Sequence, residues 1–259
     1  MKERWKDINS RLGEVRKNNK GTPMRIIKYN NSDDINVEFL DKFRYVKEHQ
    51  SYSNFVRGQI KNPYDRTVYG IGYIGVGIYK PMKNKDVIET RYNDWRNMLG
   101  RCYSEDEREY DVYHHCKVDE RWLNYQNFSQ WFEENKYPIE NERLQVDKDI
   151  LNPCNTIYSP ETWLLVPNRI NALFINKPNK RGLPNGITKV GLKYSAKYNN
   201  LNLGTYYTVE EAFDVYAKAK KDNIIRFAFE YKNILPAKVF DALIRYEVKI
   251  ENDKNYFKS

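Results

Sequence analysis

The stretch LQVDKDILNPCNTIYSPETWLLVPNRIN, residues 144–171, carries the strongest structural signal in this chain. A short apolar strand runs into two alternating carboxylates, Asp147 and Asp149, and an Asn-Pro turn follows. From Pro160 onward the pattern predicts a helix that ends near Asn171. The order strand, loop, helix would bring carboxylates and amides to one small space. Hard oxygen ligands of this kind suit Mg²⁺ or Mn²⁺, so we expect a divalent metal site here.

The same segment resembles the HNH-like endonuclease domains that are common in bacteriophage genomes. The resemblance extends upstream through residues 92–103 (YNDWRNMLGRCY) and 122–131 (WLNYQNFSQW). It implies a ββα-metal domain over residues 83–178 and metal-dependent hydrolysis of DNA phosphodiesters. The chain differs from the family at the end of the first strand. Where the family carries its general-base histidine, this chain reads Asp147-Lys148-Asp149.

By position in the motif, the resemblance assigns a role to each polar residue of the segment. Asp147 either takes the place of the histidine as the base or binds the metal, and Asp149 is the second candidate for the catalytic carboxylate. Asn155 would orient the base. Asn171 stands where the family carries its last His or Asn ligand, and Lys148 is placed to contact a phosphate.

Ordinary structural roles stay open for the same residues. Asp147 suits a surface carboxylate, Asn155 a turn residue and Asn171 a helix C-cap. The histidines His114 and His115 are most simply explained as surface or core residues, although either is able to reach the site as a base.

The N-terminal part divides into a basic arm and a β-rich module. Residues 1–20 combine apolar residues at helical spacing with an excess of Lys and Arg, so they predict a short basic helix that lies along DNA or packs on its neighbour. Residues 21–82 predict a β module, with strands at 24–29 and 35–39.

The β module also contains a closely spaced set of glycines. Gly70, Gly72 and Gly75 match the dinucleotide-binding pattern G-x-G-x-x-G. That pattern must open a helix, and the residues that follow, through Pro81, cannot propagate one. We therefore expect glycine-rich strands or a loop that lets another backbone approach closely.

Residues 179–259 have a different character. Three short strands are expected over residues 187–207, followed by a helix that opens at the capping box of Thr208 and Glu211. A last helix is expected over residues 236–246, since proline suits a first turn.

This C-terminal segment resembles the AP2-like DNA-binding domains. The resemblance is carried by KYSA at residues 193–196, LGTY at 203–206 and EEAFDVY at 210–216. It implies a three-stranded sheet that contacts the major groove. Three lysines are expected on one alternating face of that sheet, and lysine favours phosphate contact over base reading. The residues predicted to contact DNA are Lys148, Arg181, Lys189, Lys193, Tyr194, Lys197 and Tyr198.

The expected fold class is therefore α+β, with a small N-terminal β module, a central ββα-metal (HNH-like) domain and a C-terminal three-stranded sheet plus helix (AP2-like). The expected boundaries are a basic arm at residues 1–20, the β-rich module at 21–82, the HNH-like domain at 83–178 and the AP2-like domain at 179–259.

Composition narrows the class of protein. The net charge is +9, and basic flanks surround an acidic centre, which suits a nuclease whose flanks hold phosphates. The mean hydropathy is −0.87, no apolar run reaches membrane length, and the first residues carry no secretion signal. Three cysteines without a paired spacing indicate a reducing compartment. We expect a cytoplasmic protein of an infected bacterial cell, without a membrane partner.

Two functional classes follow from these observations. The first is a metal-dependent endonuclease that nicks or cuts double-stranded DNA, with Mg²⁺ or Mn²⁺ as cofactor. The second is a catalytically degenerate protein that keeps the scaffold for binding DNA, or a phage inhibitor that binds a host protein. The missing histidine favours the second class, and the clustered carboxylates and amides favour the first.

Overall fold

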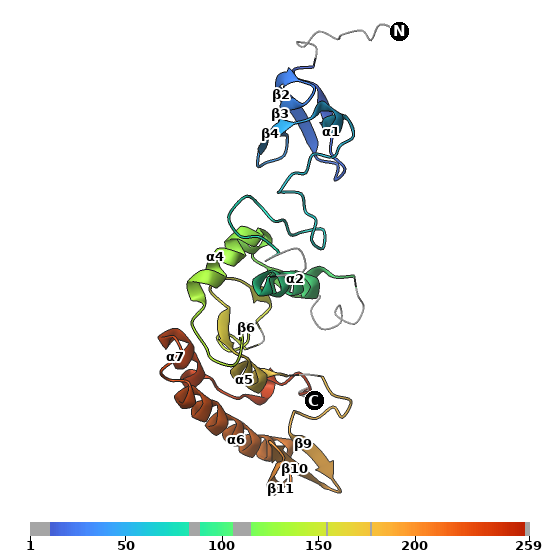
Figure 1. Ribbon diagram of the computed structural model, residues 1–259. Coiled ribbons are helices and arrows are strands. Elements are labelled where there is room, and N and C mark those ends of the chain that lie inside the picture. Colours follow the sequence, from blue (N-terminus) through green and yellow to red (C-terminus); the bar gives the residue numbers. More distant parts are fainter. Residues whose placement is uncertain (1–10, 83–88, 106–114, 154, 177, 257–259) are drawn as a thin grey trace. The chain divides into compact units, whose positions relative to one another are not determined.

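The computed structural model describes residues 11–82, 89–105, 115–153, 155–176 and 178–256 (Figure 1). It has a mixed α+β fold, with an N-terminal four-stranded antiparallel sheet, small two-stranded sheets, and a C-terminal three-stranded sheet packed on a long helix. The chain divides into two compact units, residues 1–89 with 123–126, and residues 90–122 with 127–259. Among the described helices, none combines the length and the apolar composition that crossing a bilayer requires.

The first unit is built on an antiparallel sheet whose strands follow one another in sequence. Its elements are β1 (Val15–Lys17), β2 (Pro23–Asn31), β3 (Asp34–Phe39), β4 (Val46–Gln50) and the short helix α1 (Tyr52–Val56). Alternation along β3 buries Ile35, Val37 and Phe39, which pack against Met24 and Phe55. The strands predicted at residues 24–29 and 35–39 are confirmed.

The helix predicted for the basic arm is wrong over the described residues of that arm. Val15 pairs with Arg25 and Lys17 with Pro23, which makes this segment an edge strand of the sheet. Leu12 and Val15 are 55% and 53% exposed. Their helical spacing therefore has no buried face to stabilise it, and pairing with β2 satisfies the backbone instead. Residues 1–10 lie outside the described part of the chain.

The glycine-rich segment forms a loop clamped by side chains of the same unit. A Cβ added at Gly75 would collide with the Asn124 amide, and one at Gly77 would collide with the Gln126 amide. Gln126 Nε2 donates to the carbonyls of Ile74 (3.1 Å) and Tyr79 (2.9 Å). The predicted loop is confirmed, but the groups that approach its glycines are side-chain amides and not the backbone that was predicted.

The second unit begins with an aromatic cluster. Its first elements are α2 (Thr90–Tyr103), β5 (Lys117–Val118), the 3₁₀ turn η2 (Glu120–Leu123) and α4 (Tyr125–Asn135), apart from residues 123–126, which belong to the first unit. Trp95 Nε1 donates to the Trp122 carbonyl at 2.6 Å. The Trp122 ring lies 4.8 Å from the Trp131 ring and 5.1 Å from the Trp163 ring, centroid to centroid. The hydrogen bond ties α2 to η2, and the edge-on ring contacts join η2 to α4 and to the residue before β8.

An antiparallel hairpin and a short helix follow. The elements are β6 (Leu144–Asp147), β7 (Ile157–Tyr158), β8 (Leu164–Pro167), α5 (Asn168–Asn171) and the 3₁₀ turn η3 (Ala172–Phe174). β6 pairs with β8, from Leu144 opposite Pro167 to Asp147 opposite Leu164, while β7 runs parallel to β5. The strand predicted at the start of this stretch is confirmed.

The helix predicted from Pro160 to Asn171 is wrong. Residues 159–162 form a turn, the strand β8 follows, and only α5 is helical. All four residues of β8 are buried, so this apolar run is a two-sided core strand rather than one face of an amphipathic helix.

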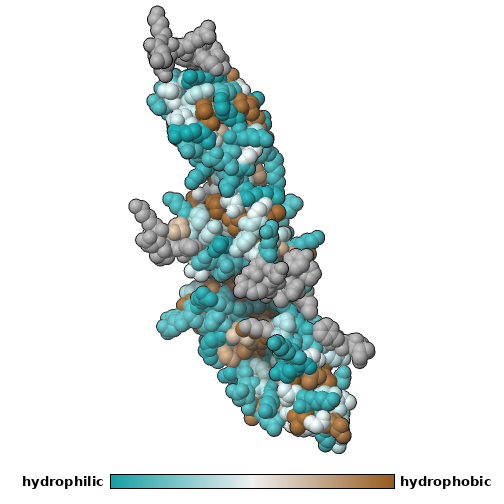
Figure 2. Space-filling view, turned by 90° about the vertical axis from the view of Figure 1, so that its right-hand side faces the viewer, coloured by the Kyte–Doolittle hydropathy of each residue, from teal (hydrophilic) through white to brown (hydrophobic). Residues whose placement is uncertain are grey.

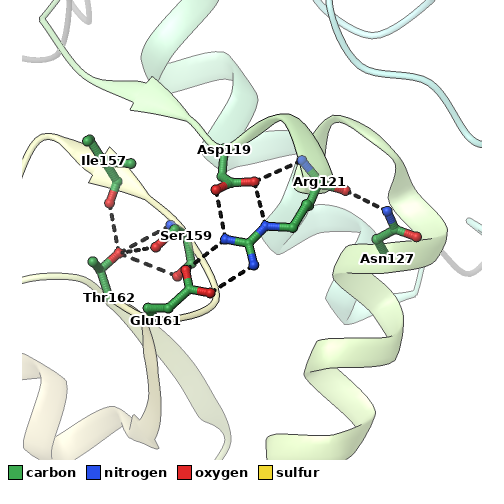
Figure 3. A network of polar contacts seen from close by, with 7 residues as sticks. All are labelled: Asp119, Arg121, Asn127, Ile157, Ser159, Glu161 and Thr162. Atoms are coloured by element: carbon green, nitrogen blue, oxygen red, sulfur yellow. Dashed lines mark hydrogen bonds and ion pairs between the residues drawn. The ribbon is translucent and has the colours of Figure 1, made fainter.

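Hydrogen bonds hold that turn in place (Figure 3). Thr162 Oγ1 donates to the Ile157 carbonyl at 2.8 Å. Arg121 donates to both carboxylate oxygens of Asp119 and of Glu161, with all four distances at 2.8 Å. The bonds from Arg121 lower the pKa of the Glu161 carboxyl to about 2. The guanidinium thus ties the segment after β5 to the turn before β8.

The C-terminal part contains the predicted three strands and two helices. They are β9 (Ile187–Val190), β10 (Lys193–Tyr198), β11 (Leu201–Tyr206), α6 (Val209–Glu230) and α7 (Ala237–Arg245), followed by the 3₁₀ turn η4 (Ile250–Asn252). The sheet order is β11-β10-β9. The capping box is confirmed, because Thr208 Oγ1 accepts from Glu211 N and the Glu211 carboxylate accepts from Thr208 N, both at 3.1 Å.

Helix α6 contributes side chains to two hydrophobic cores. Near its N-terminus Ala212, Phe213 and Tyr216 pack on the three-stranded sheet. Its C-terminal half instead packs on the hairpin and α5, where Ile224 and Phe227 belong to the same buried cluster. The hairpin, α5 and η3 contribute Ile150, Leu164, Val166, Ile170 and Phe174 to that cluster, and the end of α6 with α7 contributes Ala228, Tyr231, Leu235, Val239 and Leu243. With 22 residues, a helix spans about 33 Å, enough to serve both cores.

The segment between the hairpin and the three-stranded sheet is fastened by the C-terminal residues. Asn185 donates to Asp253 Oδ2 through its backbone N and its side-chain amide, each at 3.0 Å. Asn179 N donates to Asn255 Oδ1 at 2.6 Å, and Asn176 Nδ2 donates to the carbonyl of Asn252 at 2.8 Å. This Pro/Gly-rich stretch is therefore held in a defined path.

Candidate functional site

A cavity of about 760 Å³ in the second unit brings part of the predicted site together. It lies at the C-terminal end of β6, and residues of α2, α5, α6 and the C-terminal segment line its walls. Five predicted residues line it: Asp147, Lys148, Asp149, Asn155 and Asn171. The other six predicted residues, Arg181, Lys189, Lys193, Tyr194, Lys197 and Tyr198, are not among its lining residues.

Asp147 is the central carboxylate of this cavity. It is 8% exposed, and its Oδ1 accepts from the backbone N–H groups of Asp149 (2.9 Å) and Ile150 (2.8 Å). Within the described residues, Oδ2 accepts no hydrogen bond. Burial, together with the charge of Asp149, raises the pKa of Asp147 to about 6, although the two backbone hydrogen bonds and Lys148 favour the ionised form. One oxygen of this largely buried carboxylate is thus left for a ligand.

Lys148, Asp149 and Asn155 form a small network beside Asp147. Lys148 Nζ pairs with Asp149 Oδ1 at 2.5 Å and donates to the Asn155 carbonyl at 3.0 Å. The Asn155 side chain bonds to Ile157, donating to its carbonyl at 2.6 Å and accepting from its N–H at 3.0 Å. The Asn155 amide therefore stabilises its own turn, and Lys148 neutralises part of the charge at the cavity.

Asn171 lies on the same side of the hairpin as Asp147. Its side-chain amide is hydrogen-bonded to the side-chain amide of Gln145 at 2.6 Å. Gln145 and Asp147 are alternate residues of β6 and so share one face of the strand. Asn171 makes no capping bond, since the C-cap of α5 is Ala172 and the Asn171 side chain caps no turn. The amide is therefore directed to the β6 face rather than to the helix end.

Residues that sequence reasoning missed also line the cavity. Asp94 and Arg101 come from α2, His115 from the segment before β5, Arg143 from the approach to β6, and Lys220 from α6. The sequence indicates His115 only as a residue able to reach the site, and His114 lies outside the described residues. The sequence feature that could have identified Asp94 is its position next to Trp95. Because Trp95 is buried, an adjacent carboxylate is partly shielded from solvent.

Asp94 is a second carboxyl with an unusual environment. Its Oδ2 is buried and has no hydrogen-bond partner. Burial raises the pKa of Asp94 to about 6, and the charges of Arg143 and Arg101 offset part of that effect. Such a group is able to hold or release a proton close to neutral pH.

We expect the substitution Asp94→Asn to stabilise the protein at neutral pH and to have little effect in acid. The pKa of Asp94 is higher in the folded protein than the ordinary 3.8, so ionisation opposes folding. That penalty is absent below pH 3.8, grows as the pH rises, and is complete above about pH 6. Removing it should add about 1–3 kcal/mol to the free energy of unfolding at neutral pH. Denaturant unfolding across this pH range measures the effect, with the exposed Asp222→Asn as matched control. An equal gain at acid and neutral pH would contradict it.

The donor set limits which metal the cavity suits. Among the described residues, no group of three or more His, Cys, Asp or Glu side chains is arranged to hold an ion. Asp147 Oδ2 and the Asn171 amide offer hard oxygen ligands from one face of the hairpin. Mg²⁺ binds through one or two carboxylates and keeps several waters, with substrate phosphates completing its shell. The residues present therefore fit Mg²⁺ or Mn²⁺ bound together with a phosphate, and not a closed zinc site.

Lys189, Lys193 and Lys197 do not all lie on one face of the three-stranded sheet. The prediction that they share a face is therefore wrong. Lys189 stands opposite Tyr194, and Lys193 stands opposite Val190. Residues directly opposite each other share a face, so Lys189 lies on the face of Tyr194 and Ala196 that packs on α6. Alternation along β10 leaves Lys193 and Lys197 on the other face. The pairing of β9 with β10 therefore decides on which face of the sheet Lys189 lies.

The tyrosines and the remaining basic residue have distinct surroundings. Tyr194 and Tyr198 pack against the core between the sheet and α6, and Tyr198 Oη accepts from Asn223 Nδ2 at 2.8 Å. Arg181 is exposed in the segment before β9. Figure 2 shows a surface that is mostly hydrophilic with separate hydrophobic patches, and Leu192 at the β9–β10 turn is 93% exposed.

Comparison of the chain with protein-family models, curated proteins and solved structures gives no match. Function is therefore inferred from the chemistry of the cavity and from the motifs of the chain.

Proposed function

We propose that this protein is a metal-dependent DNA endonuclease of the HNH-like phage type, with an AP2-like C-terminal part that binds double-stranded DNA. The observation that carries this proposal is the Asp147 carboxylate, which is buried at the cavity with one oxygen free of hydrogen bonds. Asn171 lies on the same face of the hairpin. The order of β6, β8 and α5 agrees with the ββα arrangement that the sequence resemblance implies.

The residues of the cavity suit hydrolysis of a phosphodiester. Asp147 and Asn171 would hold the divalent ion, which when bound supplies a Lewis acid for a phosphate oxygen and for the leaving 3′ oxygen. Arg101 and Arg143 place positive charge at the cavity wall, where neighbouring phosphates would lie. Asp94, with its pKa raised to about 6 by burial, is suited to accept a proton from water. If Asp147 takes the place of the family's histidine as base, Asn171 keeps its role as ligand.

A protein that binds DNA without cutting it is the alternative. It is favoured by the side chain of Asn155, which is engaged within its own turn rather than with an acid–base group. It is also favoured by Lys148, whose charge is taken up by Asp149. A phage inhibitor that binds a host protein would use the same inactive scaffold.

Incubation of supercoiled plasmid and of linear phage DNA with the purified protein tests the proposal. The expected result is conversion of the supercoiled form to nicked or linear DNA in Mg²⁺ or Mn²⁺, with none in EDTA. The exposed Asp214→Asn variant, purified in parallel, should cut equally well and so controls for preparation effects. DNA binding without cleavage in either metal would overturn the endonuclease and leave the DNA-binding alternative.

A further inference from the structure

Lys220 of helix α6 has an environment that differs from that of its neighbours. Its side chain is partly buried and lines the cavity that contains Asp147. Within the described residues Lys220 forms neither a hydrogen bond nor an ion pair. The next residue, Lys221, shows the contrast, because its Nζ donates to the carbonyls of Ile244 and Tyr246 at 2.6 Å each. Lys221 thus caps the C-terminal end of α7, whereas Lys220 makes no such contact.

The carboxylate whose charge acts on Lys220 does not pair with it. Asp253 acts on Lys220 only through its charge. Both of its carboxylate oxygens are occupied by amides, Oδ2 by Asn185 N and Nδ2, and Oδ1 by Asn255 N and Nδ2, at 2.9–3.0 Å. Burial lowers the pKa of the Lys220 ammonium, as expected for a cation that has lost water without gaining a partner.

The charge balance of the cavity favours an anion beside this ammonium. Six Lys and Arg side chains and four Asp side chains line it. Lys148 is paired with Asp149, Lys249 is paired with Glu247, and Lys254 has a partner as well. Among the lysines that line the cavity, the ammonium without an ion pair or hydrogen bond in the described part of the chain is therefore that of Lys220. A cavity of about 760 Å³ has room for a phosphodiester group. An ammonium suits a phosphate as a point charge, without demanding a fixed planar geometry.

We infer that Lys220 binds a phosphate of the nucleic-acid backbone in this cavity, so that the C-terminal helix α6 completes the site carried by β6 and α5. This inference rests on the proposed function and deepens it. It makes the C-terminal part a contributor to the site itself, beyond a tether for DNA. Since α6 also packs on the three-stranded sheet, one rigid helix would set the distance between the sheet that binds DNA and the cavity.

An alternative without a ligand is that Lys220 merely covers apolar surface with its methylene groups. Tyr216 lies one helical turn before it and also lines the cavity. In that case the ammonium would remain in solvent, and DNA would leave its reactivity unchanged.

Acetylation with acetic anhydride, read by mass spectrometry, tests the inference at the level of the residue. A duplex oligonucleotide at saturating concentration should slow the acetylation of Lys220 several-fold. It should leave Lys218, which is exposed on the same helix, nearly unchanged. The measurement is made in EDTA and repeated in Ca²⁺, so it does not depend on cleavage. Inorganic phosphate forms a second arm: protection by phosphate alone would assign the site to a free anion and overturn the nucleic-acid assignment, and no protection by either would overturn the inference entirely.

The substitution Lys220→Met provides the second measurement. Methionine keeps the length of the side chain and removes a partly buried charge, so the variant should melt at the same temperature as the wild type or higher. Its affinity for duplex DNA should fall about tenfold, and the slope of log affinity against log salt should shrink by about one. Lys218→Met should change neither quantity as much. An unchanged affinity and slope would refute the role of Lys220, even if the wild type cuts plasmid. Protection of Lys220 in a protein that cuts nothing would uphold the phosphate site and refute the endonuclease.

Discussion

The substitution Asp147→Asn should abolish metal-dependent DNA cleavage while leaving the protein as stable as the wild type or more stable. A carboxylate that holds a metal or takes a proton contributes about 100-fold or more to the rate, and an amide cannot replace its charge. The amide oxygen can still accept from the N–H groups of Asp149 and Ile150, which organise the end of β6. The local fold should therefore survive the change.

The stability of this variant separates a functional carboxylate from a structural one. Burial raises the pKa of Asp147 to about 6, above its ordinary 3.8. Its ionised form therefore opposes folding in the absence of metal, with no penalty below pH 3.8 and the full penalty above about pH 6. Removing the charge should add about 1–3 kcal/mol to the free energy of unfolding at neutral pH in EDTA.

Nicking rates and melting temperatures, each with and without Mg²⁺, measure both effects. The wild type should melt at a higher temperature in Mg²⁺, because a ligand that binds the folded state stabilises it. Asp147→Asn should lose this response, while the exposed Asp214→Asn should keep it along with full activity. If Asp147→Asn cut DNA at the rate of the wild type, Asp147 would have no part in the chemistry. If it lost stability at neutral pH, its role would be structural.

The substitution Ile224→Ala should destabilise the hairpin and the C-terminal helices together. Ile224 is fully buried in the cluster that contains Val166 and Ile170 from the hairpin side and Leu243 from α7. Removing three carbons from such a position costs about 2–5 kcal/mol through lost transfer energy and the cavity that remains. The loss should appear in both parts, because they share this core.

Two spectroscopic probes distinguish a shared core from independent domains. Trp95, Trp122, Trp131 and Trp163 all lie outside the C-terminal sheet and helices, so tryptophan fluorescence reports the part that carries the hairpin. A Trp5→Phe background removes the remaining tryptophan. Far-ultraviolet circular dichroism weights the long helix α6. Ile224→Ala should shift both denaturant transitions by the same amount, whereas Leu192→Ala at an exposed turn should shift neither by more than about 0.5 kcal/mol. A shift seen by circular dichroism alone would show that the two parts unfold independently.

Much of the local structure could be read from the chain because near neighbours encode it. The alternation of residues 35–39 specifies a half-buried strand, and Thr208 with Glu211 specifies the start of α6. The strand that ends at Asp147 and the proline-initiated helix α7 follow from equally local patterns. Interactions within a few residues act in the same way whatever the rest of the chain does.

Other features depend on partners that are distant in the sequence. The apolar run at residues 163–166 suits a buried strand or a buried helix equally, and pairing of β8 with β6 resolved the ambiguity. The face on which Lys189 lies was set by its register against Tyr194. Residues 15–17 form an edge strand despite the helical spacing of Leu12 and Val15, because pairing with β2 satisfies the backbone hydrogen bonds.

The candidate site shows the same division. Asp147 and Asn171 could be selected from one stretch, because a hairpin and a short helix place them within a short span of chain. Asp94 and Lys220 lie far from that stretch, and only the packing of α2 and α6 brings them to its cavity. Their partial burial and lack of hydrogen-bond partners arise from that packing. Residue types and position in the motif therefore selected Asp147 as a candidate, whereas the desolvation and the charges around it come from contacts that only the folded chain creates.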